Sequence, residues 1–389
     1  MIIKIKRKDF HLGSLFFIGL FSLCLVSSIA CRDRAVNQSE PQAVTTIEAA
    51  TPQDSVPPPK DTTRLLKIVG VGDMMLGTNY PSSSYLPPNG GKDLLKDVEA
   101  ILKGADLTFG NLEGTILDEG GTAKRCNNPA VCYVFRSPES YVQHFVNAGF
   151  DILSIANNHS GDFGPTGRKK TKSVLDQAGI HYAGLAGTDE SVIFEKDGIT
   201  YGFSAFAPNR GTVDIRNLSH AKQIVSELAE KVDIVIVSFH GGAEGASNQH
   251  VTRKTETYYG ENRGNVYNFA HAVIDAGADI VFGHGPHVTR AVELYKDRFI
   301  AYSLGNFCTY GRFSLSGPAG YAPLITLTVD EEGVFQEGQI TPVYQQKAHG
   351  PKIDGQKRAI TKLQALTQQD FPETPLRILD DGKIEKKKD

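Results

Sequence analysis

The chain has 389 residues, 40% of them apolar, contains no tryptophan and carries a formal net charge of −3 at pH 7. This length suffices for one large α/β domain with appendages or for two domains of average size. The mildly acidic charge argues against nucleic-acid binding, which needs a basic surface. The lack of tryptophan and the modest aromatic content argue against an aromatic sugar-stacking cleft.

The first 30 residues, 1–30, have the layout of a secretory signal peptide. A basic start is followed by an apolar core from Leu12 to Val26 and by small residues before Cys31. The "SIAC" ending resembles the lipobox of bacterial lipoproteins, in which the cysteine becomes the lipidated first residue. We therefore expect export and a lipid anchor at Cys31. Simple secretion after cleavage and an uncleaved anchor helix are the alternatives, and each of them also exports the chain.

Residues 31–63 are rich in Pro, Gln, Ser and Thr, a composition that cannot bury enough apolar surface to become ordered. We expect this segment to be a tether in front of a folded domain over residues 64–345. The remaining residues, 346–389, are expected to be a C-terminal extension that ends in a solvated charged tail, "KIEKKKD".

Helix and strand patterns alternate along the expected domain. The spacing of apolar residues predicts helices over residues 92–105, 137–150, 165–179, 219–232 and 265–278. Short apolar runs between them predict strands that are buried on both faces. Two hairpins, over 192–206 and 322–345, predict that the sheets are mixed, and the first hairpin is expected to turn at Asp197-Gly198. The predicted fold class is therefore α/β.

Two cysteines, Cys126 and Cys132, enclose a short run with turn residues, "NNPAV". In an oxidising compartment this spacing indicates a local disulfide. The alternative, a metal role for the two cysteines, lacks a matching second pair. Cys308 is then left over and is expected to be buried beside a strand. Two arginines, Arg125 and Arg136, flank the loop and are candidates for binding an anionic substrate, with simple solvation as the alternative.

Polar residues follow six of the apolar runs. The endings are Gly72-Asp73, Gly110-Asn111-Leu112-Glu113, Asn157-Asn158-His159, His240-Gly241-Gly242-Ala243-Glu244, Gly283-His284-Gly285-Pro286-His287 and Gly305-Asn306. Ligands of open α/β sheets bind at the carboxyl ends of strands, so these endings are expected to converge on one site. Asp, Glu, Asn and His are ligands of divalent metals. Each ending alone is typical of a turn, but the joint pattern predicts a metal centre.

Six stretches, taken in chain order, resemble the CapA family of capsule-synthesis and poly-γ-glutamate biosynthesis proteins. They are "VGDMMLG", "FGNLEGTI", "SIANNHSGDFG", "SFHGGAE", "GHGPH" and "SLGNF". The match spans residues 65–344, almost the whole expected domain. The resemblance implies a fold similar to that of the metallophosphatases, which is a four-layer αββα sandwich with mixed sheets.

The resemblance also implies roles for the residues of the strand endings. The implied ligands of one or two divalent ions (Mn, Zn, Fe or Mg) are Asp73, Glu113, Asn158, His240, His284 and His287, with Asn111 as the alternative to Glu113. His159 stands where a histidine protonates the leaving group, and Glu244 is a further ligand or a base. Asn306 is a substrate contact, and Asn157 is left as a turn residue.

Three features depart from the phosphatase pattern: the first motif, "DMM", offers no histidine, the second motif is "GNLE", and two residues instead of one separate His284 from His287. The leading hypothesis is an envelope-anchored, metal-dependent hydrolase or amide-bond enzyme that acts on an anionic polymer such as poly-γ-glutamate. The expected partners are this polymer, the membrane and other capsule-synthesis membrane proteins. The alternatives are a non-catalytic component that binds or exports the polymer and a periplasmic metallophosphoesterase, which fold analogy alone suggests.

Overall fold

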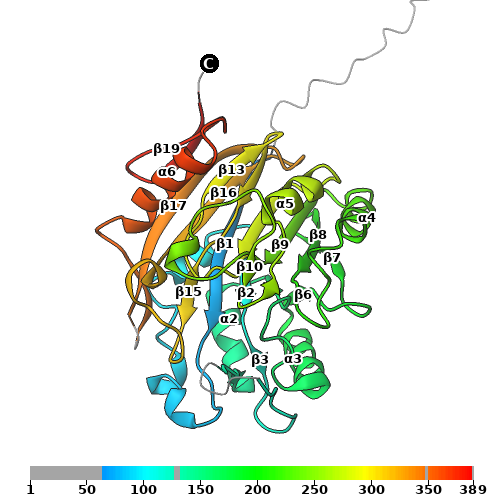
Figure 1. Ribbon diagram of the computed structural model, residues 1–389, viewed down its shortest axis with the longest axis vertical. Coiled ribbons are helices and arrows are strands. Elements are labelled where there is room, and N and C mark those ends of the chain that lie inside the picture. Colours follow the sequence, from blue (N-terminus) through cyan, green and yellow to red (C-terminus); the bar gives the residue numbers. More distant parts are fainter. Residues whose placement is uncertain (1–63, 127–131, 347–348, 388–389) are drawn as a thin grey trace, which may run out of the picture. The chain divides into compact units, whose positions relative to one another are not determined.

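The computed structural model describes residues 64–126, 132–346 and 349–387. The expected signal peptide, the tether and the lipidation site Cys31 lie outside the described residues. Within the described part of the chain, no helix combines the length and the apolar character needed to cross a bilayer. The described residues build two large β-sheets with helices packed against them (Figure 1).

The first sheet has ten strands and contains both parallel and antiparallel pairs. Its central strand, β1 (Leu66–Met75), runs parallel to β2 (Leu107–Leu112) and β15 (Asn306–Thr309) and antiparallel to β16 (Tyr321–Val329). Parallel pairing continues from β2 through β5 (Ile152–Ser154) to β6 (His181–Ala183). Beyond β16 lie β17 (Phe335–Gln346), β18 (Gly350–Ile353), β20 (Lys383–Lys386) and β19 (Leu376–Ile378).

The second sheet has six strands. Their order is β13 (Val292–Tyr295), β14 (Arg298–Ala301), β12 (Ile280–His284), β9 (Ile234–His240), β8 (Ile199–Phe206) and β7 (Ser191–Lys196). The four inner strands are parallel, and every residue of β9 and β12 is buried, as expected for strands covered on both faces. Two small sheets pair β3 (Thr115–Ile116) with β4 (Arg136–Ser137) and β10 (Thr257–Tyr258) with β11 (Glu261–Asn262).

Apolar side chains of the two large sheets meet in a shared core. Phe109 of β2 stacks on Phe282 of β12 with ring centroids 5.1 Å apart and ring planes 6° apart. The other face of the first sheet packs against α1 (Glu99–Lys103), α2 (Val142–Ala148) and α3 (Gly164–Ala178). The other face of the second sheet packs against α4 (Leu218–Ala229) and α5 (Val266–Ile274). This order of layers confirms the predicted four-layer αββα sandwich with mixed sheets.

The C-terminal residues are part of the sandwich, so the expected boundary at residue 345 is wrong. β17 continues to Gln346, and the residues beyond it add β18, β19 and β20 to the first sheet, together with α6 (Arg358–Asp370). The first four residues of the predicted solvated tail, Lys383–Lys386, form β20, in which charged residues flank the fully buried Ile384. An apolar residue between charged ones is typical of a strand with one buried face, and the high charge of the segment concealed it.

One predicted helix is much shorter than expected. Leu94, Leu95 and Val98 are buried, as their spacing predicts, but they lie in turns, and α1 begins only at Glu99. Both predicted hairpins are present, as β7–β8 and β16–β17. Asp197 and Gly198 both have positive φ, at 52° and 79°, which is the backbone that a tight two-residue hairpin turn requires.

Candidate metal centre

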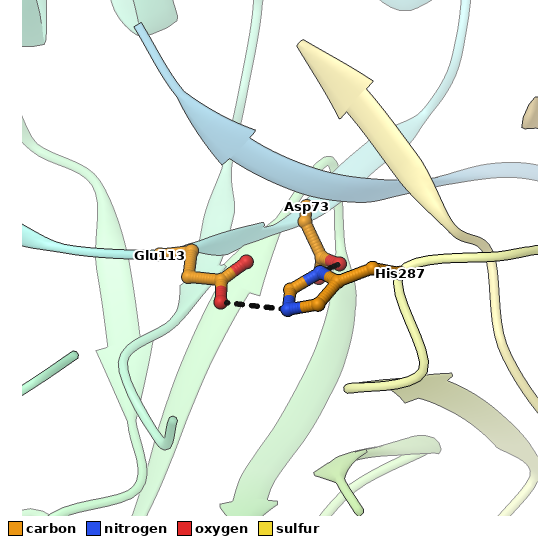
Figure 2. A group of neighbouring side chains, drawn as sticks. All are labelled: Asp73, Glu113 and His287. Carbon is orange, nitrogen blue, oxygen red and sulfur yellow. Dashed lines mark hydrogen bonds and ion pairs between the residues drawn. The ribbon is translucent and has the colours of Figure 1, made fainter. Parts of the chain in front are cut away.

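Three side chains from different segments lie together at the strand ends, as Figure 2 shows. Nδ1 of His287 lies 2.9 Å from Oδ2 of Asp73, and Nε2 of the same ring lies 3.5 Å from Oε1 of Glu113. The imidazole therefore bridges two carboxylates. Both carboxylates are completely buried, whereas 18% of the His287 side chain is exposed. These are residue types that bind hard or borderline divalent cations.

Asp73 owes its position to a close approach of two backbone segments. It lies near the end of β1, and its N–H donates to the carbonyl of Gly305 at 2.8 Å, one residue before β15 begins. A Cβ atom on Gly72 would lie 2.0 Å from that carbonyl oxygen, so only glycine fits there. Asn306, the first residue of β15, is the register partner of Asp73. The glycines thus bring two of the predicted strand endings side by side.

The second sheet contributes two imidazoles. His240 ends β9, His284 ends β12, and the two residues are register partners in neighbouring parallel strands. Nδ1 of His284 lies 3.3 Å from Oδ1 of Asp73. The ring centroid of His240 lies 6.2 Å from that of His287. The two sheets therefore deliver ligand-type side chains to one place, the edge at which their parallel strands end.

The buried polar atoms of these residues test whether a divalent metal fits. Within the described residues, the following side-chain atoms are buried without a hydrogen-bond partner: both oxygens of Glu113, both ring nitrogens of His240 and of His284, and the amide oxygens of Asn158 and Asn306. Burying a polar atom without a partner costs free energy. Oxygen and imidazole nitrogen are the atoms that a divalent cation takes as ligands, so this donor set fits the predicted metal.

Electrostatic coupling links the carboxylates to the imidazoles. Burial alone would raise the pKa of Asp73, but its contacts with His284 and His287 outweigh burial and hold that pKa well below its ordinary value. Burial raises the pKa of Glu113 despite the opposing charge of His287, and the charges of Asp73 and Glu244 raise it further. Burial opposes the charge of His287, but Glu113 and Asp73 outweigh it and raise the pKa to about 10. A positive charge between the two buried carboxylates would therefore stabilise their ionised forms.

His159 forms a separate corner of the site with its own partners. Its Nδ1 atom lies 2.8 Å from Oδ2 of Asp162, and Oδ1 of Asp162 pairs with Nζ of Lys124 at 2.6 Å. The His159 ring also stacks on Phe135 with centroids 4.2 Å apart. Its other nitrogen, Nε2, lies 3.9 Å from Oε1 of Glu113. These contacts orient the ring so that Nε2 faces the carboxylate cluster.

Asp162 was not among the predicted site residues, although the sequence held a signal for it. It follows His159 by three residues in a glycine-containing turn, "HSGD", and such turns bring residues at this spacing into contact. Its Oδ2 also accepts the backbone N–H of Phe135 at 2.6 Å, so this carboxylate is held on several sides. Burial lowers the pKa of His159, and the opposing influence of Asp162 does not cancel this effect. The protonated form of His159 is therefore a stronger acid than ordinary histidine.

Glu244 lies at the edge of the site beside an arginine that the sequence did not predict. Oε1 of Glu244 is 3.2 Å from Nη2 of Arg263, and 22% of the Glu244 side chain is exposed. Arg263 is buried and donates from Nε to the Gly242 carbonyl at 3.1 Å. Burial, together with the charge of Arg263, lowers the pKa of His240 well below its ordinary value. Arg263 belongs to none of the six strand endings, and only tertiary packing brings it here.

Two asparagines of the motifs serve the structure around the ligands. Nδ2 of Asn111 donates to Oδ1 of Asp73 at 2.8 Å, so this amide supports the buried carboxylate, whereas Glu113 faces the imidazoles. Nδ2 of Asn157 donates to the carbonyl of Leu112 at 2.8 Å, in keeping with the turn role predicted for it. The roles of Asn158 and Asn306 as ligand and substrate contact remain predictions that their buried amide oxygens suit.

The region of the disulfide loop holds the two arginines predicted as substrate contacts. Cys126 and Cys132 are joined in a disulfide, and Cys308 is buried with a free thiol. Nε of Arg136 donates to Oδ1 of Asn79 at 2.6 Å, and its guanidinium packs over the Phe163 ring, 5.0 Å from the centroid. Packing therefore holds the Arg136 guanidinium in place, and its role as a substrate contact stays a prediction. Arg125 is exposed, which agrees with its solvated alternative.

These layers and this site define an α/β protein of the four-layer αββα sandwich class, with carboxylates and imidazoles gathered at its strand ends. A profile of the family described as "Bacterial capsule synthesis protein PGA_cap" matches residues 67–310. The chain therefore belongs to this family, which confirms the resemblance that the six motifs carry.

Curated relatives are identical to this chain at more than a quarter of the aligned positions. "Capsule biosynthesis protein CapA" of Bacillus anthracis is 29% identical over 263 residues, which cover 62% of this chain and 59% of the relative. "PGA biosynthesis protein CapA" of Bacillus subtilis (strain 168) is 29% identical over 253 residues, covering 61% of each. The chain thus spans about three-fifths of the length of these two relatives.

Solved structures are similar at a greater distance. A hypothetical protein from Thermus thermophilus aligns with a TM-score of 0.43 and 17% identity, covering 71% of this chain and 98% of that protein. A 5′-nucleotidase precursor from the same organism aligns with a TM-score of 0.38 and 13% identity, covering 79% and 59%. The fold assignment depends on the layers and the strand order described above.

Proposed function

We propose that this protein is an envelope-anchored component of capsule or poly-γ-glutamate synthesis or processing, and that it is a metal-dependent hydrolase or amide-bond enzyme acting on an anionic polymer. Membership of the capsule synthesis family supports the process. The observation that carries the enzymatic part is the group of buried ligand atoms without partners beside Asp73 and Glu113.

The protein's own side chains divide the chemistry between them. The residues that would hold a divalent ion are Asp73, Glu113, Asn158, His240, His284 and His287. When bound, such an ion supplies Lewis acidity and lowers the pKa of a coordinated water. Strand ends of both sheets hold these ligands, so little reorganisation is needed on binding. Nδ1 of His159 faces the Asp162 carboxylate, so the neutral ring has its proton at Nδ1. The protonated ring has a second proton at Nε2, on the Glu113 side, and this is the proton that His159 is placed to give to the leaving group.

Metal analysis and an activity assay test this proposal together. The purified full-length chain is expected to retain a divalent metal through gel filtration. With Mn or Zn added, it is expected to release products from γ-glutamyl oligomers, and a panel of phosphoesters serves as the comparison substrate. Protein that retains no metal, and that cleaves neither the amides nor the phosphoesters under these conditions, would contradict the proposal.

A non-catalytic role in binding or exporting the polymer is the second candidate. The "Probable polyglutamine synthesis accessory protein" of Mycobacterium tuberculosis, 30% identical over 228 residues that cover 52% of this chain and 55% of the relative, is named as an accessory protein. Complementation of a deletion strain separates the two roles. Full capsule production by the Asp73→Ala and His240→Ala variants would favour binding or export, and loss of capsule with normal protein levels would favour catalysis.

Membrane anchoring at Cys31 is also part of the proposal, supported by the "SIAC" ending alone. Growth with a radioactive fatty acid is expected to label the wild-type protein and not the Cys31→Ala variant. Label that persists in this variant, or that never appears on the wild type, would contradict lipidation at this residue.

A further inference from the structure

Solvent reaches the centre at two of the proposed ligands. The side chains of Asp73, Glu113 and His284 are completely buried, whereas the His287 side chain is 18% exposed and Asn158 is also partly exposed. The His287 imidazole therefore lies on an open approach to the buried carboxylates. The residues that pack on this ring from outside are accordingly the first that a substrate meets on this approach.

Phe313 is the residue at this approach. Its ring packs edge-on against His287, with centroids 5.5 Å apart and planes at 80°. It also stacks on Phe135 at 5.1 Å, and Phe135 in turn stacks on His159. Phe313 itself is partly exposed. A row of two phenylalanine rings therefore joins the two histidines, and its partly exposed member, Phe313, offers apolar contact to a substrate, whereas Phe135 is buried.

Arg312 stands beside this surface as a free cation. Its guanidinium lies 5.3 Å from the ring centroid of Tyr85 and 5.1 Å from that of Tyr133, and Nη2 donates to the carbonyl of Cys132 at 3.2 Å. Within residues 64–126, 132–346 and 349–387, no carboxylate lies within ion-pair distance of it. Stacking between aromatic rings holds the guanidinium in place without neutralising its charge.

Three other cations near the centre are paired with carboxylates. Lys124 pairs with Asp162, Arg263 contacts Glu244, and Arg290 forms two hydrogen bonds to the Glu256 carboxylate, both at 2.8 Å. Each of these cations is therefore balanced by a carboxylate. Arg312 has only one carbonyl acceptor for its fork of N–H donors, which leaves donors available for an external anion. Arg136 also has a single acceptor, the Asn79 amide oxygen, but Arg312 is the arginine that adjoins the partly exposed Phe313.

We propose that Arg312 and Phe313 form the subsite that binds the substrate next to the bond at the centre: Arg312 binds a carboxylate of the neighbouring polymer unit, and Phe313 packs on the aliphatic part of the chain. This inference rests on the proposed function, since it assumes an anionic polymer as substrate. A planar guanidinium matches a carboxylate through two parallel hydrogen bonds. The subsite therefore distinguishes a polymer of free acids from the same polymer in neutral form.

Binding measurements test the subsite without relying on turnover. Fluorescence anisotropy with the full-length chain would give the Kd of a labelled γ-glutamyl oligomer and of the same oligomer as its neutral methyl ester. Arg312→Gln is expected to weaken binding of the acid about tenfold or more and to leave binding of the ester unchanged. Arg312→Lys keeps the charge but not the fork and is expected to fall between. Phe313→Ala is expected to weaken binding of both oligomers alike.

The controls separate this subsite from charge and folding effects. Lys231→Gln removes an exposed positive charge before β9, at the end of that strand opposite to His240, and is expected to bind both oligomers like wild type. Thermal unfolding shows whether the Arg312 variants fold normally. Acid binding by folded Arg312→Gln at wild-type strength, or an equal loss for acid and ester, would overturn the subsite while leaving the proposed function intact. A wild-type protein that binds neither oligomer would contradict both.

Discussion

Two histidines of the same centre have opposite environments. His284, on the second sheet, is fully buried; its Nδ1 atom lies 3.3 Å from Oδ1 of Asp73, but neither ring nitrogen makes a well-aligned hydrogen bond among the described residues. His159, on the first sheet's side, has its Nδ1 atom 2.8 Å from Asp162 and its ring stacked on Phe135. A buried imidazole with free ring nitrogens is suited to binding a metal ion. An imidazole whose tautomer is set by a carboxylate is suited to transferring a proton.

The largest effect is expected at the ligand side. His284→Ala removes a residue that would bind the metal directly. Even the loss of a supporting residue around a metal lowers metal affinity about 10-fold to 100-fold, so this variant should lose more than about 100-fold. Metal content after gel filtration would measure this, with activity lost in parallel. His220→Ala, which removes a half-exposed histidine paired with Glu190 away from the centre, is the matched control and should keep the metal. Full metal retention by His284→Ala would contradict the role of His284 as a metal ligand.

A change at the proton donor, His159, should lower activity and leave the metal bound. His159→Ala is expected to lower kcat by about 100-fold to 10,000-fold, the usual contribution of a general acid or base, with unchanged metal content. The neighbouring variant Asn158→Ala should instead weaken metal binding, because the Asn158 amide oxygen is buried without a partner among the described residues. Metal loss in His159→Ala with a fully loaded Asn158→Ala would reverse these two assignments.

A smaller effect is expected when the partner of His159 is changed. Asp162→Asn keeps the size of the side chain but removes the charge that holds the His159 tautomer, so activity should fall about 10-fold to 100-fold with the metal retained. The comparison to make is the dependence of kcat on pH, because a residue that only supports the loop would lower activity without moving the profile. An unshifted pH profile of kcat would show that Asp162 only supports the loop and does not act on His159.

A buried carboxylate remote from the centre gives the smallest effect. Burial raises the pKa of Asp279 from its ordinary 3.8 to about 6, although the N–H of Val235 and the charge of Arg298 oppose this shift. The folded state therefore binds the Asp279 proton more tightly than the unfolded state does, and protonation stabilises the fold. This contribution to the free energy of unfolding is fully present below pH 3.8 and is lost as the pH rises through 6. The loss is about 3 kcal/mol in the free energy of unfolding.

Urea unfolding between pH 4 and pH 7 measures this contribution. Asp279→Asn mimics the protonated form, so its free energy of unfolding should fall less with rising pH than that of the wild type. The metal content of this variant should be normal, since Asp279 lies at the start of β12 and His284 at its end. Identical pH dependence in the two proteins would show that Asp279 ionises without cost to the fold.

Much of the fold was readable from local patterns, and parts of the site were not. Apolar runs ending in polar residues indicated both the parallel strands and the ligand types, and the Asp197-Gly198 turn indicated a hairpin. The strand at Lys383–Lys386 was missed because its single buried apolar residue, Ile384, stands among charged ones. Arg263 and Arg312 were missed because nothing local marks an arginine whose surroundings come from distant segments.

Local sequence patterns were enough to indicate the α/β layering, the order of the ligand-bearing strand ends and thereby the family, because strand periodicity and turn residues act over short stretches of chain. How the residues within each ending divide their roles follows from the tertiary structure. It placed Glu113 toward the imidazoles and turned Asn111 back to support Asp73. It also placed Asp162 on His159 and left Arg312 without a carboxylate among the described residues. Such choices depend on how two sheets approach each other, and no single segment encodes that distance.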